Sequence, residues 1–313
     1  MHDITSEVNN KYNTVSHINS ELTTNATEFI TSCEERYHHY IKGFANMAAK
    51  SGENTVIMVA GPSSAGKTTS SKILCDALAA QGIESEMVSL DDFFIGTTGT
   101  PMDENGKRDY ETVHALNIEQ IHDCFETLTQ TGTCNFPQFD FSIGEPSVNK
   151  RHIQLDKNDV VIVEGLHALN SLVLSAIDAK HVLKLYINVD RRVYDDNGNV
   201  ILSRRDLRLI RRISRDAIYR NSNISNTLDM WPAVQHGERE YLFPTSHSAD
   251  YVINTFHSYE PALFKNLVLP LVFDLDKTHP QYDFALKIAA GLDKFVSIPT
   301  DSIPKNSLLR EFF

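Results

Sequence analysis

The stretch that decides the fold is Gly61-Pro62-Ser63-Ser64-Ala65-Gly66-Lys67-Thr68, which fills every position of the phosphate-loop pattern G-x-x-x-x-G-K-[ST]. An apolar run, Val56–Ala60, precedes it, and a helix-compatible run, Thr68–Gln81, follows it. Glycines allow backbone N–H groups to turn inward around phosphate oxygens, and the next helix adds its positive N-terminal end. Lys67 can reach the β- and γ-phosphates, and the Thr68 hydroxyl can ligate Mg²⁺. The motif in this context predicts a binding site for a nucleoside triphosphate.

Length and composition describe a globular chain. Its 313 residues suit one large α/β domain or two modest ones, and 41% hydrophobic residues can form a buried core. The formal net charge of −12 argues against a broad nucleic-acid-binding surface, which needs clustered positive charge. The sequence contains no apolar run of membrane-spanning length, no signal-peptide pattern, and no C-x-x-C or zinc-ligand spacing among its four cysteines. We therefore expect a cytoplasmic protein with reduced cysteines that binds neither nucleic acid nor membrane.

Alternation of apolar strands with helices indicates an α/β fold of the P-loop NTPase type, with a doubly wound, mainly parallel sheet flanked by helices. The runs expected to form strands are Val56–Ala60, Glu86–Leu90, Val160–Val163, Val182–Val189 and Tyr251–Ile253. The segment Phe136–Leu155 carries Pro137, Gly144 and Pro146, and is expected to form a β excursion outside the core sheet.

Both ends of the chain are expected to flank this core. Apolar residues recur every three or four positions from Asn25, which predicts an amphipathic helix that packs on the sheet. A dimer contact, and with it a homo-oligomer, is the alternative use of that helix. A second helix is predicted over Tyr282–Val296, followed by a Pro/Ser-rich surface tail. The predicted divisions are a helical extension at 1–52, a phosphate-loop domain at 53–298 with a lid at about 191–222, and a tail at 299–313.

Acidic residues close two predicted strands, at the edge where open parallel sheets bind their ligands. Asp91 and Asp92 end the second strand, and Glu164 ends the strand Val160–Val163. An acid there, beside a phosphate loop, is in the usual position of a Mg²⁺-linked carboxylate. The alternatives are a helix N-cap for the aspartates and a helix N-terminal acid for Glu164. One aspartate could instead accept a proton from a substrate hydroxyl, or activate water for hydrolysis.

Seven arginines lie between Arg204 and Arg220. At 3.6 residues per turn, four of them share one face of a helix, namely Arg204, Arg208, Arg211 and Arg215. Cations this close repel one another unless polyanions or carboxylates neutralise them. We expect an arginine-rich lid helix whose guanidinium groups grip ATP and stabilise the transferring phosphoryl group. A solvated, salt-bridged helix is the alternative.

Taken together, the motifs resemble the uridine kinase/phosphoribulokinase branch of the P-loop kinases. Six pieces match in the family's order and cover about Asn54 to Thr255: Gly61–Thr69, Ser89–Phe94, Asp109–Glu111, Pro137–Phe141, Val163–Gly165 and Arg208–Asp216. The resemblance is closest to a bacterial-type, uridine kinase-like subgroup, because a segment Leu228-Asp229-Met230-Trp231-Pro232 and then Gly237-Glu238 follow the arginines. Members of that subgroup often carry an extra N-terminal domain, which is expected to be missing here.

The resemblance implies roles for the matching residues. Asp91 matches the family's catalytic aspartate, Glu111 an acid that holds ribose hydroxyls, and Phe139 an aromatic residue beside the base. The implied catalytic residues are Asp91, Lys67, Arg211 and Arg215. The implied ATP contacts are Gly61, Ser63, Ser64, Ala65, Gly66, Lys67, Thr68, Thr69, Arg208 and Arg212. The implied substrate contacts are Asp92, Tyr110, Glu111, Phe139 and Trp231, although a lone Trp more often packs in a core. The implied Mg²⁺ ligands are Thr68, Glu164 and Asp91.

The function that follows is an ATP- and Mg²⁺-dependent small-molecule kinase acting on the 5′-hydroxyl of uridine or cytidine. One departure from the family concerns the acceptor: where uridine–cytidine kinases commonly place a base-reading histidine, this chain has Gly144, with His114 or His152 as substitutes. Another hydroxylated acceptor, such as a purine nucleoside, pantothenate or a sugar phosphate, is therefore the alternative. A nucleotide-dependent regulatory ATPase is a further alternative. The sequence lacks the N-K-x-D motif that reads guanine.

Overall fold

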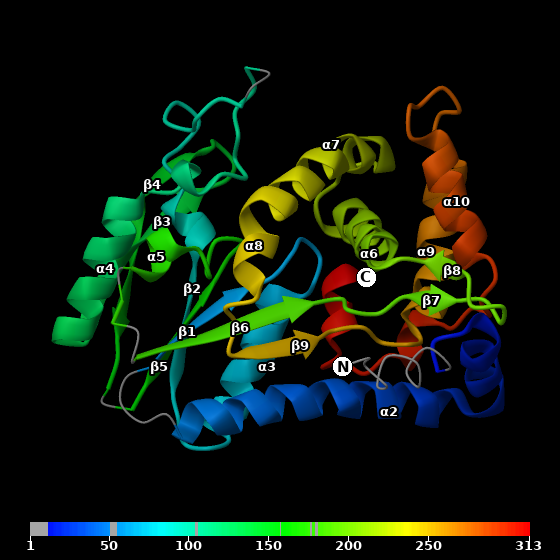
Figure 1. The fold of residues 1–313 in the computed structure, drawn as a ribbon, viewed down its shortest axis with the longest axis horizontal. Coiled ribbons are helices and arrows are strands. Elements are labelled where there is room, and N and C mark those ends of the chain that lie inside the picture. Colours follow the sequence, from blue (N-terminus) through cyan, green and yellow to red (C-terminus); the bar gives the residue numbers. More distant parts are fainter. Residues whose placement is uncertain (1–11, 51–54, 104–105, 157, 176, 179–180) are drawn as a thin grey trace.

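The computed structural model describes residues 12–50, 55–103, 106–156, 158–175, 177–178 and 181–313. Its centre is a parallel sheet with the strand order β2-β5-β1-β6-β9 (Figure 1). The strands are β1 (Thr55–Ala60), β2 (Ser85–Ser89), β5 (Val160–Glu164), β6 (Val182–Asn188) and β9 (Tyr251–Asn254). The order reverses beside β1, so the ligand-binding edge of the sheet lies at the carboxyl ends of β1 and its neighbours. The predicted doubly wound sheet is confirmed.

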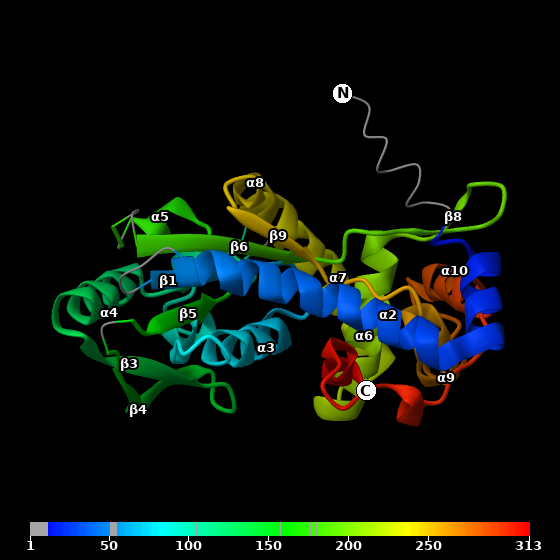
Figure 2. The same cartoon turned by 90° about the horizontal axis from the view of Figure 1, so that it is seen from below.

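Helices cover both faces of this sheet because its strands are apolar on both sides. On β1, Ile57 and Val59 join the hydrophobic core under helices α2 (Val15–Lys50) and α3 (Lys67–Ala79). Met58 and Ala60 join the core on the opposite face. That face is covered by α4 (Ile118–Thr131), with α5 (Ser171–Leu174) and α8 (Phe243–Ser246) beside it. In Figure 2, α2 and α3 lie on the same side of the sheet.

The N-terminal helix α2 packs on the sheet, as its apolar period predicts. Tyr37, Ile41 and Phe44 are buried in the core. The helix is interrupted at Asn25, whose backbone is non-helical and whose side-chain oxygen accepts the N–H of Glu28. The start predicted at Asn25 is therefore the start of the second part of α2, since helical structure begins already at Val15. Residues 1–11 of the predicted extension lie outside the described residues.

The predicted β excursion is an antiparallel hairpin of β3 (Thr133–Asp140) and β4 (Glu145–Gln154). A second, short hairpin joins β7 (Val193–Tyr194) to β8 (Val200–Leu202). It leads into α6 (Arg204–Tyr219), which begins with a capping box between Ser203 and Asp206.

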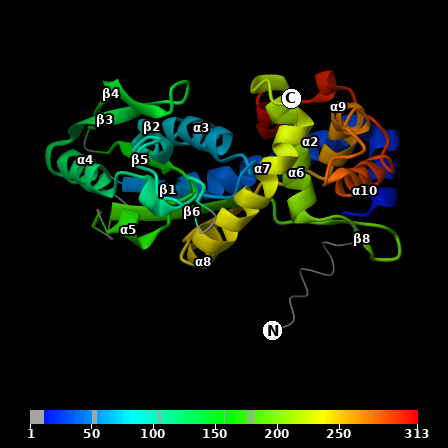
Figure 3. The ribbon, with the colours of Figure 1, turned by 90° about the horizontal axis from the view of Figure 1, so that it is seen from above.

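The arginine-rich helix α6 lies inside the molecule. Figure 3 shows α6 and α7 (Ile224–Gly237) between the sheet and the helices α9 (Glu260–Phe273) and α10 (Tyr282–Leu292). A π-helical turn, Glu238–Leu242, continues α7 and leads to α8. No helix within the described ranges is both long and apolar enough to cross a membrane. All four cysteines are free, as predicted, and three of them are buried.

The expectation of a surface tail at 299–313 is wrong. The chain ends in a 3₁₀ turn, Leu308–Phe312, in which Leu308, Leu309 and Phe312 are fully buried. This turn packs against α3 and α6. The physical reason is that the last six residues are mostly apolar, and burying a Leu or Phe side chain is worth about 1.5–3 kcal/mol.

Candidate active site

The phosphate loop connects β1 to α3 and depends on left-handed backbone at two positions. Gly66 has φ +87° and Ser64 has φ +59°, and a non-glycine residue rarely adopts such values. A Cβ on Gly66 would also lie 2.6 Å from the side chain of Leu308. Lys67 folds back over the loop, and its Nζ donates to the carbonyl oxygen of Gly61 at 2.9 Å. The loop thus has the tight turn and the inward lysine that the motif predicts.

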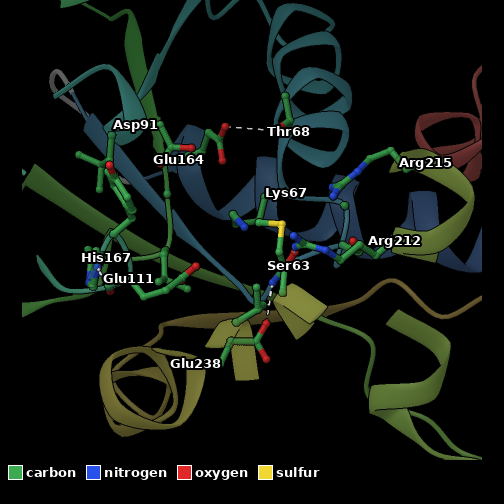
Figure 4. A pocket seen from close by; sticks show the side chains of 18 of the residues that line it. Ser63, Lys67, Thr68, Asp91, Glu111, Glu164, His167, Arg212, Arg215 and Glu238 are labelled. Carbon is green, nitrogen blue, oxygen red and sulfur yellow. Dashed lines mark hydrogen bonds between the residues drawn. The ribbon is translucent and has the colours of Figure 1, made fainter. Parts of the chain in front are cut away.

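A cavity of about 330 Å³ opens above this loop, and we call it the phosphate-loop pocket (Figure 4). The predicted site residues that line it are Ser63, Ser64, Gly66, Lys67, Thr68, Asp91, Tyr110, Glu111, Glu164, Arg212 and Arg215. They come from the loop after β1, the turn after β2, the end of β5, α3, α6 and the loop before α4. The fold thus brings together residues as far apart in the sequence as Ser63 and Arg215, 152 positions. His167, Arg220, Glu238 and Glu311 also line it.

Hard oxygen donors gather on one side of the pocket. The Thr68 hydroxyl donates to Glu164 Oε1 at 3.0 Å, and Asp91 lines the same wall. Burial raises the pKa of both carboxyls, while the charge of Lys67 opposes that rise. No three carboxylate, imidazole or thiol groups converge as a preformed metal centre among the residues described. Mg²⁺ fits such a site, since it binds one or two protein carboxylates and takes its other ligands from water and phosphates.

A second pair of acids, Glu111 and Glu238, lines the pocket on the side away from Thr68 (Figure 4). Burial, and then the charge of Glu238, raise the pKa of Glu111 to about 7. The end of α7 approaches closely at Gly237, where a Cβ would lie 2.5 Å from that of Glu111. His167 Nε2 contacts the Glu111 carbonyl oxygen at 2.8 Å, and burial lowers the pKa of His167 to about 4. His167 is therefore neutral near pH 7.

Arginines close the side of the pocket toward α6. Arg212 Nη1 donates to the hydroxyl of Ser63, in the phosphate loop, at 2.7 Å. Arg212, Arg215 and Arg220 all pair with Asp216, at 3.3, 2.9 and 3.7 Å. One carboxylate cannot neutralise three guanidinium groups, so this wall carries a surplus of positive charge suited to a polyanion.

Arg208, Arg211 and Trp231 do not line the pocket, although a ligand contact was expected of each. Arg208 Nη2 donates to Glu238 at 2.7 Å, and Arg211 Nε donates to Glu260 at 2.6 Å. The indole of Trp231 is buried, with the Arg208 guanidinium 5.4 Å from its ring centre. These three residues therefore make contacts within the protein. Buried carboxylates from distant elements neutralise Arg208 and Arg211, and Trp231 packs beside Arg208.

Further expected contacts also lie outside the pocket lining. Gly61 and Ala65 belong to the loop itself, and the Thr69 hydroxyl donates to Glu311 at 2.7 Å. Asp92 Oδ1 accepts the backbone N–H of Phe139 at 3.1 Å and so fastens the β3–β4 hairpin to the strand end. The Phe139 ring contacts Phe94, which does line the pocket, with 5.7 Å between ring centres.

The sequence did not point to four titratable residues of the lining: His167, Arg220, Glu238 and Glu311. In the sequence, Glu238 stands out only as part of a Gly-Glu pair, and Arg220 only as one of seven arginines. His167 follows the Val163–Gly165 motif, which was a signal for its place. Glu311 falls in the predicted tail, where the neighbouring Leu308-Leu309 and Phe312-Phe313 are the available sign of burial.

Comparison with known proteins gives a consistent result. A model of the phosphoribulokinase/uridine kinase family matches residues 56–260, which is most of the chain. The uridine kinase-like protein 5 of Arabidopsis thaliana is 29% identical over 199 residues, which are 63% of this chain and 38% of that protein. The uridine kinase of Halobacterium salinarum is 25% identical over 63% of this chain and 78% of its own. The match thus spans well under half of the plant relative.

Solved structures are also similar to this chain. A structure described as a possible uridine kinase from Bacillus stearothermophilus has a TM-score of 0.43 at 17% identity, over 64% of this chain and 88% of that one. A D-glycerate 3-kinase from Cryptococcus neoformans has a TM-score of 0.39 at 14% identity, over 76% of this chain and 87% of that one.

Proposed function

The chain belongs to the phosphoribulokinase/uridine kinase family, and we propose that it is an ATP-dependent kinase that phosphorylates the 5′-hydroxyl of uridine or cytidine. One observation carries the proposal: the phosphate loop, the three predicted acids Asp91, Glu111 and Glu164, and the arginines of α6 converge on one pocket of about 330 Å³. Phosphoryl transfer needs this combination, because its catalysis consists mainly of positioning and electrostatic stabilisation.

The donor half of the proposed site is the phosphate loop. Ser63 to Thr68 would surround the β- and γ-phosphates of ATP, with Lys67 as their cation. Thr68 and Glu164, already 3.0 Å apart, would hold Mg²⁺ together with Asp91. When bound, Mg²⁺ supplies charge neutralisation for the phosphate oxygens. Arg212 and Arg215 would offset the charge that develops on the phosphoryl group as it leaves ADP.

The acceptor half lies between Asp91 and Glu111. Asp91 would accept or orient the proton of the attacking hydroxyl, which requires its carboxylate form. Glu111 would accept hydrogen bonds from the ribose hydroxyls, and Tyr110 and Phe94 would form the apolar wall near the base. The neutral His167 donates a hydrogen bond to the backbone carbonyl of Glu111 and so holds the backbone from which this side chain extends.

The experiment that tests the acceptor is a panel of hydroxylated metabolites, assayed with ATP and Mg²⁺. We expect kcat/KM for uridine or cytidine to exceed the values for purine nucleosides, pantothenate and sugar phosphates. A preference for a non-pyrimidine acceptor would replace the uridine assignment and keep the kinase. Turnover that is equally fast without any acceptor would remove the kinase proposal in favour of a regulatory ATPase.

A second acceptor class is favoured by one observation at the β3–β4 hairpin. Gly144 has φ +70° at the tip, and a Cβ there would lie 2.9 Å from Thr97 Oγ1. A base-reading histidine cannot occupy this position without strain. Among the alternatives, a hydroxylated metabolite without a pyrimidine base fits this feature, and the same panel distinguishes it.

A further inference from the structure

A second cavity, of about 560 Å³, is lined by Arg208, which also contacts the phosphate loop at Ser63. It is formed where the end of β6, the start of α6 and the turn α8 meet, three elements that Figure 1 labels. We call it the arginine cavity, after the residues that carry the argument: Tyr186, Arg192, Arg204, Arg205, Arg208 and Phe243. None of these residues lines the phosphate-loop pocket.

Four arginines at one cavity are unusual in a chain with a net charge of −12. Two of them are paired, Arg204 with Asp190 at 2.8 Å and Arg208 with Glu238. Arg192 and Arg205 are exposed and have no ion-pair or hydrogen-bond partner among the described residues. Arg204 and Arg205 also form the first turn of α6, where the helix dipole favours an anion. The cavity is therefore positively charged in a molecule that is negative overall.

The side chain of Tyr186 gives an independent sign of a ligand. Tyr186 is only 5% exposed, lines the cavity, and makes no side-chain hydrogen bond within the described part of the chain, so its hydroxyl opens into the cavity rather than into the core. A hydroxyl that faces a cavity without a protein partner is free to donate a hydrogen bond to a ligand bound there. Burial raises the pKa of Tyr186, which keeps the phenol protonated and able to donate. Phe243 adds an apolar wall beside it.

The cavity is connected to the phosphate loop through one ion pair. Arg208, which lines the arginine cavity, donates to the Ser63 carbonyl oxygen at 3.1 Å and pairs with Glu238. Glu238, which lines the phosphate-loop pocket, accepts the Ser63 N–H at 2.9 Å. An anion that draws Arg208 away from Glu238 would thus change both hydrogen bonds at Ser63. A ligand in the arginine cavity is therefore linked to the phosphate-loop pocket by the contacts of Arg208 and Glu238 with Ser63.

We propose that the arginine cavity binds the polyphosphate chain of a small-molecule effector, and that it acts on the phosphate loop through Arg208 and Glu238. A chain of two or more phosphate groups offers acceptors to Arg192, Arg205 and the Tyr186 hydroxyl, which all line the cavity. The cavity volume is within the range of small-molecule sites. Free polyphosphate and the phosphates of a nucleotide share this chemistry.

The binding test uses the full chain with Lys67→Ala, which weakens the phosphate loop, and titrates it with inorganic tripolyphosphate. We expect one saturable site per chain. Arg192→Glu with Arg205→Glu should weaken the affinity about tenfold or more, since charge-assisted hydrogen bonds are lost. The matched control is Lys277→Glu with Lys287→Glu, two exposed lysines whose reversal changes the net charge equally and should leave the affinity unchanged. Absence of saturable binding, or equal weakening in both pairs, would overturn the proposal.

Tyr186→Phe provides a second variant that keeps the buried ring. It should weaken tripolyphosphate binding several-fold, by about 1 kcal/mol for one hydrogen bond, without lowering the melting temperature. An unchanged affinity would remove Tyr186 from the site. Repeating the titration with ATP distinguishes the source: tighter binding than tripolyphosphate identifies a nucleotide effector, and equal binding identifies free polyphosphate.

The coupling test rests on the proposed kinase activity and is kept separate from binding. With wild-type Lys67, tripolyphosphate should change the KM for ATP more in the wild type than in the Arg192→Glu, Arg205→Glu variant, whose basal kcat should be unchanged. An identical response in both proteins would show that tripolyphosphate acts only at the phosphate loop, and would overturn the coupling. Failure of the kinase proposal would leave the binding titration interpretable.

Discussion

The hydroxyl of Thr69, in the first turn of α3, donates a hydrogen bond of 2.7 Å to the carboxylate of Glu311, 242 positions further along the chain. Glu311 also lines the phosphate-loop pocket. Phe312, the next residue, lies under the guanidinium of Arg211, 5.2 Å from its ring centre. The last turn of the chain is thus a wall of the proposed ATP site.

A carboxylate in this wall should oppose the binding of a triphosphate. We predict that Glu311→Gln, which keeps an acceptor for Thr69 and removes the charge, lowers the KM for ATP about threefold or more. Steady-state kinetics against ATP checks this, with kcat expected to change little. Asp301→Asn, at an exposed acid in the same terminal segment, is the control and should leave the KM unchanged. A KM that rises in Glu311→Gln would mean that the charge supports ATP binding.

Two arginines of α6 are expected to affect different properties, Arg211 the stability of the fold and Arg215 the turnover. Arg211 is fully buried against Glu260, so Arg211→Ala leaves an unpaired buried carboxylate and should cost about 3–5 kcal/mol of unfolding free energy. Arg215 lines the pocket, so Arg215→Ala should lower kcat about tenfold or more with a smaller loss of stability. Urea denaturation and kinase assays on both variants measure the two effects. The opposite pattern would contradict the assignment of roles.

Acceptor binding should depend on pH through Glu111. Because burial and Glu238 raise the pKa of Glu111 to about 7, a fall in pH below that value protonates it. A neutral carboxyl is a weaker acceptor for ribose hydroxyls, so the KM for the nucleoside should rise as pH falls from about 8 to 6. Glu111→Gln should remove this dependence, whereas Glu119→Gln, at an exposed acid of α4, should retain it.

The raised pKa of Glu111 also determines whether its contribution to the free energy of unfolding rises or falls with pH. The folded state keeps a proton on Glu111 up to about pH 7, while the unfolded state releases it near the ordinary value of 4.5. The folded state therefore binds more protons between these values, and the contribution of Glu111 to stability falls as pH rises through them. A slope of the opposite sign that disappears in Glu111→Gln would contradict the raised pKa.

Glu34 should show the reverse dependence. Burial opposes its ionisation, but His257, Ser307 and Tyr259 together lower its pKa to about 2. Its stabilising contribution is present above the ordinary value of 4.5 and is lost as pH falls from there toward 2. Glu34→Ala should cost about 3 kcal/mol at neutral pH, because it leaves buried donors without an acceptor.

Chemical denaturation across pH checks this prediction. Its matched control is Glu35→Ala, which removes the adjacent exposed acid and should cost little. Equal losses in the two variants would show that the buried contacts of Glu34 with Ser307 and Tyr259 contribute no stability.

Local patterns in the sequence predicted the sheet and half of the site. The apolar runs and the phosphate-loop motif place Lys67, Thr68, Asp91 and Glu164 because strand ends of a parallel sheet meet at one edge. The β3–β4 hairpin was likewise readable from its prolines and Gly144. In both cases the signal lies within about ten residues of the structure that it predicts.

What the sequence did not reveal depends on contacts between distant segments. The carboxylates that bury Arg208 and Arg211 are Glu238 and Glu260, 30 and 49 residues away, and no local pattern pairs them. For the same reason the periodicity of α6 places four arginines on one face, but only tertiary packing decides which guanidinium groups reach the pocket. Glu311 was missed because a short apolar cluster at a chain end has no period to read.

The fate of the γ-phosphate of ATP tests the central claim most directly. With labelled ATP, Mg²⁺ and a pyrimidine nucleoside, we predict that the label appears in the nucleoside 5′-monophosphate, and that Asp91→Asn lowers this transfer about 100-fold or more. Label that appears as inorganic phosphate, at a rate independent of any acceptor and of Asp91, would contradict the account.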